Sequence, residues 1–175
     1  MNTFQLEQIL SQDPLTSPVF GGVYPSDGLP TSLPPGKRLF IANTDPAHKP
    51  GEHWVAFYFT PGGVCTYFDS YGLPPFIPSF NRFIARNADT WKHNPRRLQH
   101  LTSQLCGHYC IFFGVQMCRG MNLNNILRLF DVDTRFNDIM MRDFVEHYYG
   151  HYLQKKSEDN SQSCCGALKA RPLMY

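Results

Sequence analysis

The chain has 175 residues, of which 42% are hydrophobic and 14% are aromatic, so we expect one globular domain with a core rich in aromatic rings. A net charge of +2 is too small to indicate a strong nucleic-acid-binding protein. The N-terminus lacks the pattern of a secretion signal, and no apolar run approaches the roughly 20 residues of a membrane span. The six cysteines lack the spacing of a disulfide framework. We therefore expect an intracellular, reduced protein with no membrane segment.

The first half of the chain predicts a helix, an irregular segment and three strands. Residues 3–12 place apolar side chains at helical spacing, and Asp13-Pro14 ends the expected helix. Residues 15–36 are rich in proline and glycine, which predicts an extended, irregular segment over the surface. The expected strands cover residues 38–43, 53–59 and 64–69, and the last two form a hairpin.

The second half predicts mainly helices. The expected helices cover residues 76–91, 106–118, 123–130 and 137–149, and a short strand covers residues 97–99. We expect Trp91 to face inward at the end of the first helix. The apolar stripe of the last helix is expected to contain Ile139, Phe144, Val145 and Tyr148. Residues 1–155 are predicted to form the domain and residues 156–175 a polar, mobile tail.

Cys106 is the first candidate for a functional residue. It stands where a polar approach meets a near-continuous apolar segment, and Gly107 follows it, which predicts the first turn of a buried helix. Helix N-termini carry partial positive charge and unpaired N–H groups. These groups favour the thiolate and can hold an oxyanion, so Cys106 is a candidate nucleophile. The alternative is a small buried side chain, which is the usual role of a free cysteine.

Three further residues form a constellation with Cys106. His53 opens one strand of the predicted hairpin and Asp69 closes the other, so the topology makes them neighbours. An acid beside a histidine stabilises the imidazolium that forms when the histidine deprotonates a thiol. Gln99, seven residues before the cysteine, is a candidate oxyanion donor, and Gln104 is its rival. Each residue also has a structural alternative: Asp69 could form a turn, and Gln99 could lie at the surface.

These residues occur within a series of short motifs that resembles a known family. The motifs are Phe-Gly-Gly-Val-Tyr (20–24), Glu-His-Trp-Val-Ala-Phe (52–57), Tyr-Phe-Asp-Ser-Tyr-Gly (67–72), Gln99 and Leu-Cys-Gly-His-Tyr-Cys (105–110). Their order is similar to that of adenain, the adenovirus maturation protease, whose relatives are encoded by adenovirus-like viruses and Polinton-type elements. The resemblance runs from about residue 20 to residue 152. It implies an α+β fold with a central mixed sheet flanked by helices.

The resemblance also implies an activity and roles for the site residues. By that match the chain is a cysteine endopeptidase in which Cys106 is the nucleophile, His53 the base, Asp69 the third triad member and Gln99 the oxyanion donor. Asp69 stands where adenain has Glu, although the related SUMO-deconjugating proteases use Asp. The chain is also shorter than adenain near residues 120–124.

Partners and cofactors follow from the same resemblance. It implies a monomeric enzyme that processes capsid or core precursor polypeptides after small, Gly-rich sequences, in the host nucleus or the virion. The chemistry requires no cofactor. Adenain is activated by a viral peptide and by DNA, but the family's peptide-pairing cysteine has no clear counterpart here, and the small charge argues against strong DNA binding.

Three other functions were weighed against the endopeptidase. A deubiquitinase or SUMO-like isopeptidase would use the same site on ubiquitin-like substrates with a Gly-Gly tail. A catalytically silent binding module would keep the fold, but the presence of all four site residues argues against it. Zinc binding through Cys106, His108 and Cys110 is disfavoured because residues two apart on a helix point to different faces.

Overall fold

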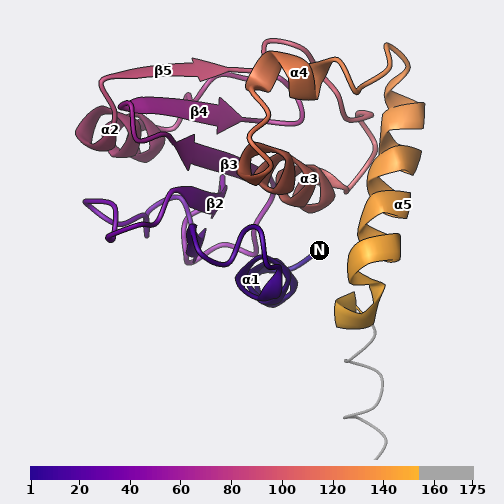
Figure 1. Ribbon diagram of the computed structural model, residues 1–175, viewed down its shortest axis with the longest axis horizontal. Coiled ribbons are helices and arrows are strands. Elements are labelled where there is room, and N and C mark those ends of the chain that lie inside the picture. The colour runs from indigo at the N-terminus through magenta and orange to yellow at the C-terminus, as the bar shows by residue number, and fades with distance from the viewer. Residues whose placement is uncertain (154–175) are drawn as a thin grey trace, which may run out of the picture.

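A five-stranded mixed sheet forms the centre of the computed structural model, which describes residues 1–153 (Figure 1). The strands are β1 (Phe20–Tyr24), β2 (Leu39–Asn43), β3 (Trp54–Phe59), β4 (Val64–Phe68) and β5 (Thr90–His93), in that order across the sheet. The β1–β2 and β4–β5 pairs are parallel, and β2–β3–β4 is antiparallel. The predicted α+β fold with a central mixed sheet flanked by helices is confirmed. The predicted tail, residues 156–175, lies outside the described residues.

Alternation along the strands produces two hydrophobic layers. Successive side chains of a strand point to opposite faces of a sheet. In β3, Ala56 and Tyr58 belong to one cluster, while Phe57 and Phe59 belong to the other. The central strands are buried on both faces, and so their sequences read as apolar runs.

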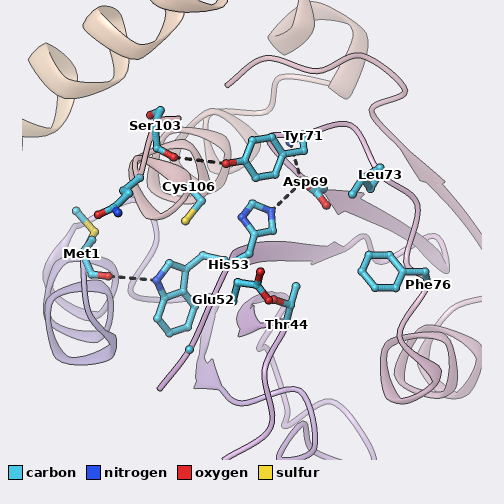
Figure 2. A pocket seen from close by; sticks show the side chains of 13 residues that line it. Met1, Thr44, Glu52, His53, Asp69, Tyr71, Leu73, Phe76, Ser103 and Cys106 are labelled. Carbon is cyan, nitrogen blue, oxygen red and sulfur yellow. Dashed lines mark hydrogen bonds and ion pairs between the residues drawn. The ribbon is translucent and has the colours of Figure 1, made fainter. Parts of the chain in front are cut away.

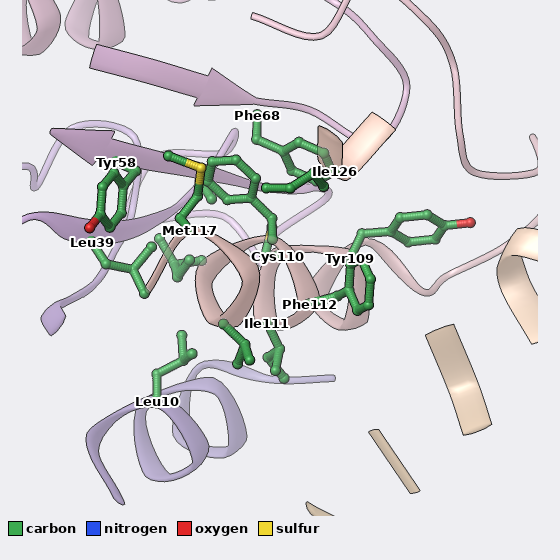
Figure 3. Close-up of a cluster of buried hydrophobic side chains, with 14 of the residues drawn as sticks. Leu10, Leu39, Tyr58, Phe68, Tyr109, Cys110, Ile111, Phe112, Met117 and Ile126 are labelled. Atoms are coloured by element: carbon green, nitrogen blue, oxygen red, sulfur yellow. The ribbon is translucent and has the colours of Figure 1, made fainter. Parts of the chain in front are cut away.

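Helices cover both faces of the sheet. They are α1 (Thr3–Gln12), α2 (Pro78–Asn87), α3 (Cys106–Cys118), α4 (Leu123–Leu127) and α5 (Thr134–Leu153). One face packs on α2, and the other packs on α1 and α3, with α5 against the outer side of α3 (Figure 1). Helix α3 is therefore surrounded: Figure 3 shows Ile111 on the side of Leu10 in α1, Met117 on the side of Tyr58 in the sheet, and Tyr109 and Phe112 on a further side. This explains why α3 reads as an apolar segment without a polar face.

The two edge strands differ from the prediction. The segment from residue 15 to 36 was expected to be irregular, but residues 20–24 form β1, which pairs with β2 through an irregular register at Gly22. Gly21 is needed there because the Phe40 ring occupies the place of a Cβ atom. The expected strand at residues 97–99 is absent, and β5 begins at Thr90 instead. Residues 97–99 continue as a loop held by other hydrogen bonds, described below.

The helix boundaries differ as well. Helix α2 ends at Asn87, whose amide nitrogen donates to the Phe83 carbonyl at 2.8 Å, and Trp91 lies in β5 with 45% of its surface exposed. The prediction that Trp91 faces inward was wrong, because residues 90–93 pair with β4. Helix α4 ends earlier than expected, at Leu127, and α5 is longer than expected.

The buried face of α5 is rotated from the predicted one. Met141, Val145 and Tyr149 are buried at i, i+4 and i+8, whereas Ile139 and Tyr148 are about half exposed. Val145 is buried as predicted and Phe144 packs against the core, but the placement of Ile139 and Tyr148 in the stripe was wrong, because packing against α3 and α1, rather than the apolar count, selects the face. In residues 1–153, no helix combines the length and the apolar character required to cross a membrane.

Candidate active site

The β3–β4 hairpin brings His53 and Asp69 together. His53 directly precedes β3 and Asp69 directly follows β4. The antiparallel register pairs Ala56 with Phe68, so its continuation places His53 level with Tyr71 and close to Asp69. The His53 Nε2 atom lies 2.8 Å from Asp69 Oδ1, and both side chains are buried. The structure thus places these two predicted residues in direct contact.

Asp69 is fixed by its own backbone as well as by His53. Its Oδ1 accepts the Tyr71 N–H at 2.7 Å, and its carbonyl accepts the Gly72 N–H at 2.8 Å, which closes a tight turn. Gly72 has φ +76°, and a Cβ atom there would strike the backbone of Arg96. Asp69 is therefore a turn residue and the partner of His53 at the same time.

Cys106 begins α3 and faces the other side of the His53 ring. Figure 2 shows the imidazole between the Cys106 sulfur and Asp69. Since Nε2 is bonded to Asp69, Nδ1 is the nitrogen left for the sulfur. Leu105, at the helix N-cap, provides no side-chain cap for the first N–H groups of α3. The backbone groups of Trp54 and Gly107 also act on the sulfur and help to lower the pKa of the Cys106 thiol.

The pKa values of the two groups shift in opposite directions. Burial acts to raise the pKa of Cys106, but the hydrogen bond and charge of His53, with the two backbone groups, lower it below its ordinary 9.0. Burial acts to lower the pKa of His53, but its hydrogen bonds with Asp69 and Cys106 raise it to about 9. Near neutral pH these shifts favour a thiolate–imidazolium pair, which is the reactive form of a cysteine nucleophile.

The other described cysteines are not activated. Burial raises the pKa of Cys65 and of Cys110, and it raises the pKa of Cys118 to about 11. All of these remain protonated thiols near neutral pH. Within residues 1–153, no three His, Cys, Asp or Glu side chains are grouped to hold a metal ion. Cys164 and Cys165 lie outside the described residues.

Gln99 lies beneath the surface and is connected to the site through Ser70, which directly follows Asp69. The structure places its side chain at 0% exposure. Its Oε1 accepts the Ser70 hydroxyl at 2.6 Å, and its Nε2 donates to the Ser103 carbonyl at 2.8 Å. The described residues supply no acceptor for the second N–H of Nε2. Gln104 is exposed and lines the cleft, so both glutamines stay candidates for the oxyanion donor.

Sequence reasoning missed three residues of the site. The Tyr71 ring packs on His53 with ring centroids 4.8 Å apart. Asn94, fully buried after β5, accepts the Asp69 N–H at 3.0 Å and donates to the Asp69 carbonyl at 2.6 Å. Ser70 connects Asp69 to Gln99. Tyr71 and Ser70 lie within the Tyr-Phe-Asp-Ser-Tyr-Gly motif, which was the available signal, whereas nothing in the sequence near Asn94 indicated its role.

A cleft of about 490 Å³ opens over the triad. Its walls come from the loop before β3, the loop after β4, the approach to α3 and Met1 (Figure 2). The exposed apolar side chains of Leu73 and Phe76 lie on one side of it, and Glu52 and Thr44 lie on another. The Trp54 indole donates to the Met1 carbonyl at 3.2 Å. Cys106 is one of the residues that line this cleft.

Comparisons with known proteins concern the fold. No protein-family model and no curated protein matches the chain. The structure is similar to the crystal structure of ASFV pS273R protease, with 17% identity, a TM-score of 0.56, and coverage of 80% of this chain and 65% of that one. A selenomethionine crystal structure of that protease gives 21% identity, a TM-score of 0.39, and coverage of 60% and 43%. The chain thus spans 65% of the length of the protease in the first match. At this identity the likeness establishes the fold, which is that of a viral cysteine protease.

Proposed function

We propose that the chain is a cysteine endopeptidase of the adenain kind, with Cys106, His53 and Asp69 as its triad. The observation that carries the proposal is the position of the His53 ring between the Asp69 carboxylate and the Cys106 sulfur at the N-terminus of α3. An acid, an imidazole and a thiol in this order activate a nucleophile by a mechanism that recurs on unrelated folds. The fold shared with a viral protease supports the same conclusion.

The proposed reaction proceeds through a thioester. The Cys106 thiolate attacks the scissile carbonyl carbon, and the carbonyl oxygen becomes an oxyanion held by the Cys106 N–H and the free N–H of Gln99. The C–N bond then breaks as the His53 imidazolium gives its proton to the leaving amine. A water molecule, deprotonated by His53, attacks the thioester carbon, and the C–S bond breaks to release the acid product and restore the Cys106 thiolate beside the His53 imidazolium. Asp69 stabilises the imidazolium whenever it forms, and none of these steps requires a cofactor.

We propose viral capsid or core precursors with small, Gly-rich cleavage sites as the substrates. The support is the family resemblance of the motifs and the viral origin of the structurally similar protease. Peptides containing Gly-Gly and Gly-X-Gly sequences provide the test, and ubiquitin-like conjugates are assayed beside them. Cleavage of the conjugates with no cleavage of the internal peptide bonds would favour the isopeptidase instead.

The experiment that tests the mechanism is alkylation by iodoacetamide across a pH range, with the labelled cysteine mapped by mass spectrometry. Cys106 should be labelled first, with a half-maximal rate at a pH below 9.0, because its pKa is lowered. Peptide hydrolysis should fall as the pH rises through about 9, where His53 loses its proton, while alkylation, which needs only the thiolate, should not fall.

Variants of two cysteines complete this test. Cys106→Ala should abolish turnover and the fast labelling. Cys110→Ala, one helical turn later, should keep both and lose stability, because Cys110 is fully buried with a raised pKa. Fast labelling of Cys65 or Cys164 with Cys106 unmodified would contradict the assignment.

A further inference from the structure

Ser70 is buried between Asp69, which contacts His53, and Gln99, the candidate oxyanion donor. It directly follows Asp69 and is 1% exposed. Its hydroxyl donates to Gln99 Oε1 at 2.6 Å, and its carbonyl accepts the N–H groups of Leu98 and Gln99 at 2.8 and 3.0 Å. One residue therefore holds both the backbone and the side chain of Gln99.

The contacts at the other end of the Gln99 amide fix its orientation. The Ser103 carbonyl can only accept, so the group that faces it at 2.8 Å is the amide nitrogen. The Gln99 oxygen must then face Ser70, whose hydroxyl serves as the donor. If this hydroxyl were absent, the buried oxygen would lose its partner, and the amide could rotate.

The segment around Gln99 is held from a further direction. The Leu98 carbonyl accepts from the Tyr109 hydroxyl at 3.1 Å and from Asn137 Nδ2 at 3.0 Å. The backbone before Gln99 is thus anchored to α3 and α5 as well as to the Ser70 carbonyl, which Ser70→Ala retains, and only the side-chain amide depends on the Ser70 hydroxyl. A change at Ser70 should therefore alter the direction of the amide more than the position of the loop.

We infer that Ser70 is a positioning residue that aims the free N–H of Gln99 at the oxyanion. Asp69 orients His53 and Ser70 orients Gln99, so two adjacent residues of one turn align the base and the oxyanion donor. This inference rests on the proposed function and adds the Ser70 hydroxyl to the groups that the reaction requires. Ser70 touches neither the substrate nor the reacting atoms.

The kinetic test compares Ser70→Ala with a matched control. Ser70→Ala should lower kcat about tenfold with KM nearly unchanged, because a misdirected donor acts on the transition state and not on substrate binding. This loss is smaller than the roughly hundred- to thousandfold loss expected when a donor is removed outright. The control is Thr66→Val in β4, since Thr66 is also buried but its hydroxyl has no partner in the described part of the chain. It should keep the wild-type kcat.

Alkylation and a double variant separate the Ser70 inference from the proposed function. Ser70→Ala should keep the wild-type rate and pH profile of Cys106 alkylation, because the thiolate–imidazolium pair does not involve Gln99. The Ser70→Ala, Gln99→Ala double variant should be no slower than Gln99→Ala alone. A changed alkylation profile would show that Ser70 acts on Asp69 and His53 instead of Gln99, and it would overturn the inference. An unchanged kcat for Ser70→Ala would overturn it as well. Absence of peptide hydrolysis by the wild type, with normal alkylation, would instead contradict the proposed function.

Two further measurements test the inference if the Ser70→Ala protein does not fold. Ser70→Thr keeps the hydroxyl. It should retain most of the wild-type kcat when the hydrolysis rate is divided by the concentration of protein whose Cys106 can be alkylated. In the unmutated protein, nuclear magnetic resonance should show slow solvent exchange of the Gln99 side-chain amide protons and fast exchange for those of exposed Gln104. Equally fast exchange at both would show that the Gln99 amide is not held, and the inference would fail.

Discussion

One oxygen of the Asp69 carboxylate carries both of its side-chain contacts. Oδ1 accepts from His53 Nε2 at 2.8 Å and from the Tyr71 N–H at 2.7 Å, while Oδ2 is buried without a partner among the described residues. The Tyr71 contact shapes the turn and needs only an acceptor. The His53 contact needs the negative charge, because it stabilises an imidazolium. The two roles can therefore be separated by an isosteric change.

Asp69→Asn should lower kcat by about two to four orders of magnitude, the range that an orienting acid supplies. The turn should persist, because an amide oxygen can still accept the Tyr71 N–H, so the melting temperature should change little. Asp27→Asn is a matched control, since the Asp27 carboxylate also accepts a loop N–H, at 2.9 Å from Ala47, away from the cleft. A lower melting temperature with an unchanged kcat would assign Asp69 to the turn alone.

The two glutamines can be ranked by substitution. Gln99→Ala should lower kcat roughly a hundred- to a thousandfold with little change in KM, because an oxyanion donor acts only on charge that develops in the transition state. Gln104→Ala should have a mild effect, because its exposed side chain is not held in place. Steady-state kinetics on one Gly-Gly peptide measure both. The reverse ranking would move the donor to Gln104.

Among the elements, α5 shows how packing selects a buried face. Its sequence offers apolar residues around much of the helix, and the stripe through Met141, Val145 and Tyr149 is the one that meets α3 and α1. Tyr149 also donates to Asp13 Oδ2 at 2.8 Å, which ties α5 to the end of α1. The helix therefore closes the face of the core that supports α3.

Two substitutions in α5 test this orientation. Met141→Ala should lower the free energy of unfolding by about 2–5 kcal/mol, because Met141 is fully buried. Ile139→Ala should change it by about 0.5 kcal/mol or less, because 48% of Ile139 is exposed. Urea unfolding monitored by circular dichroism measures both. A larger loss for Ile139→Ala than for Met141→Ala would indicate that the helix packs through the stripe predicted from the sequence, and equal losses would contradict the observed orientation.

The predictable elements were those defined by local pattern. The hairpin of β3 and β4 and the start of α3 could be predicted because aromatic and β-branched strand residues, a Pro-Gly-Gly turn and an apolar helical run are visible in adjacent residues. The parallel edge strands β1 and β5 were missed, since their partners lie well away in the sequence and their own residues are exposed or glycine-rich. Asn94 and Ser70 were missed for a related reason: their hydrogen bonds span 25 and 29 residues.

At the scale of the whole molecule, the site forms where the sheet meets α3. His53 and Asp69 come from ends of central strands, and Cys106 comes from a helix packed on one face of that sheet. The central strands contribute to both hydrophobic layers. Because His53 directly precedes β3 and Cys106 begins α3, the distance between these two residues depends on how α3 lies against β3. The Phe68 and Phe113 rings, stacked with centroids 4.6 Å apart, also pack α3 against the neighbouring strand β4. The core thus sets the geometry of the triad.

The position of Met1 affects how the protein should be purified. Met1 lines the cleft, and its carbonyl accepts the hydrogen bond of the Trp54 indole. Any affinity tag attached ahead of Met1 therefore starts in the wall of the cleft, where under the proposed function it would compete with a substrate peptide for space. A tag of this kind would raise the apparent KM and resemble a weak inhibitor in every assay. Preparations for enzymology should leave this end free of added residues.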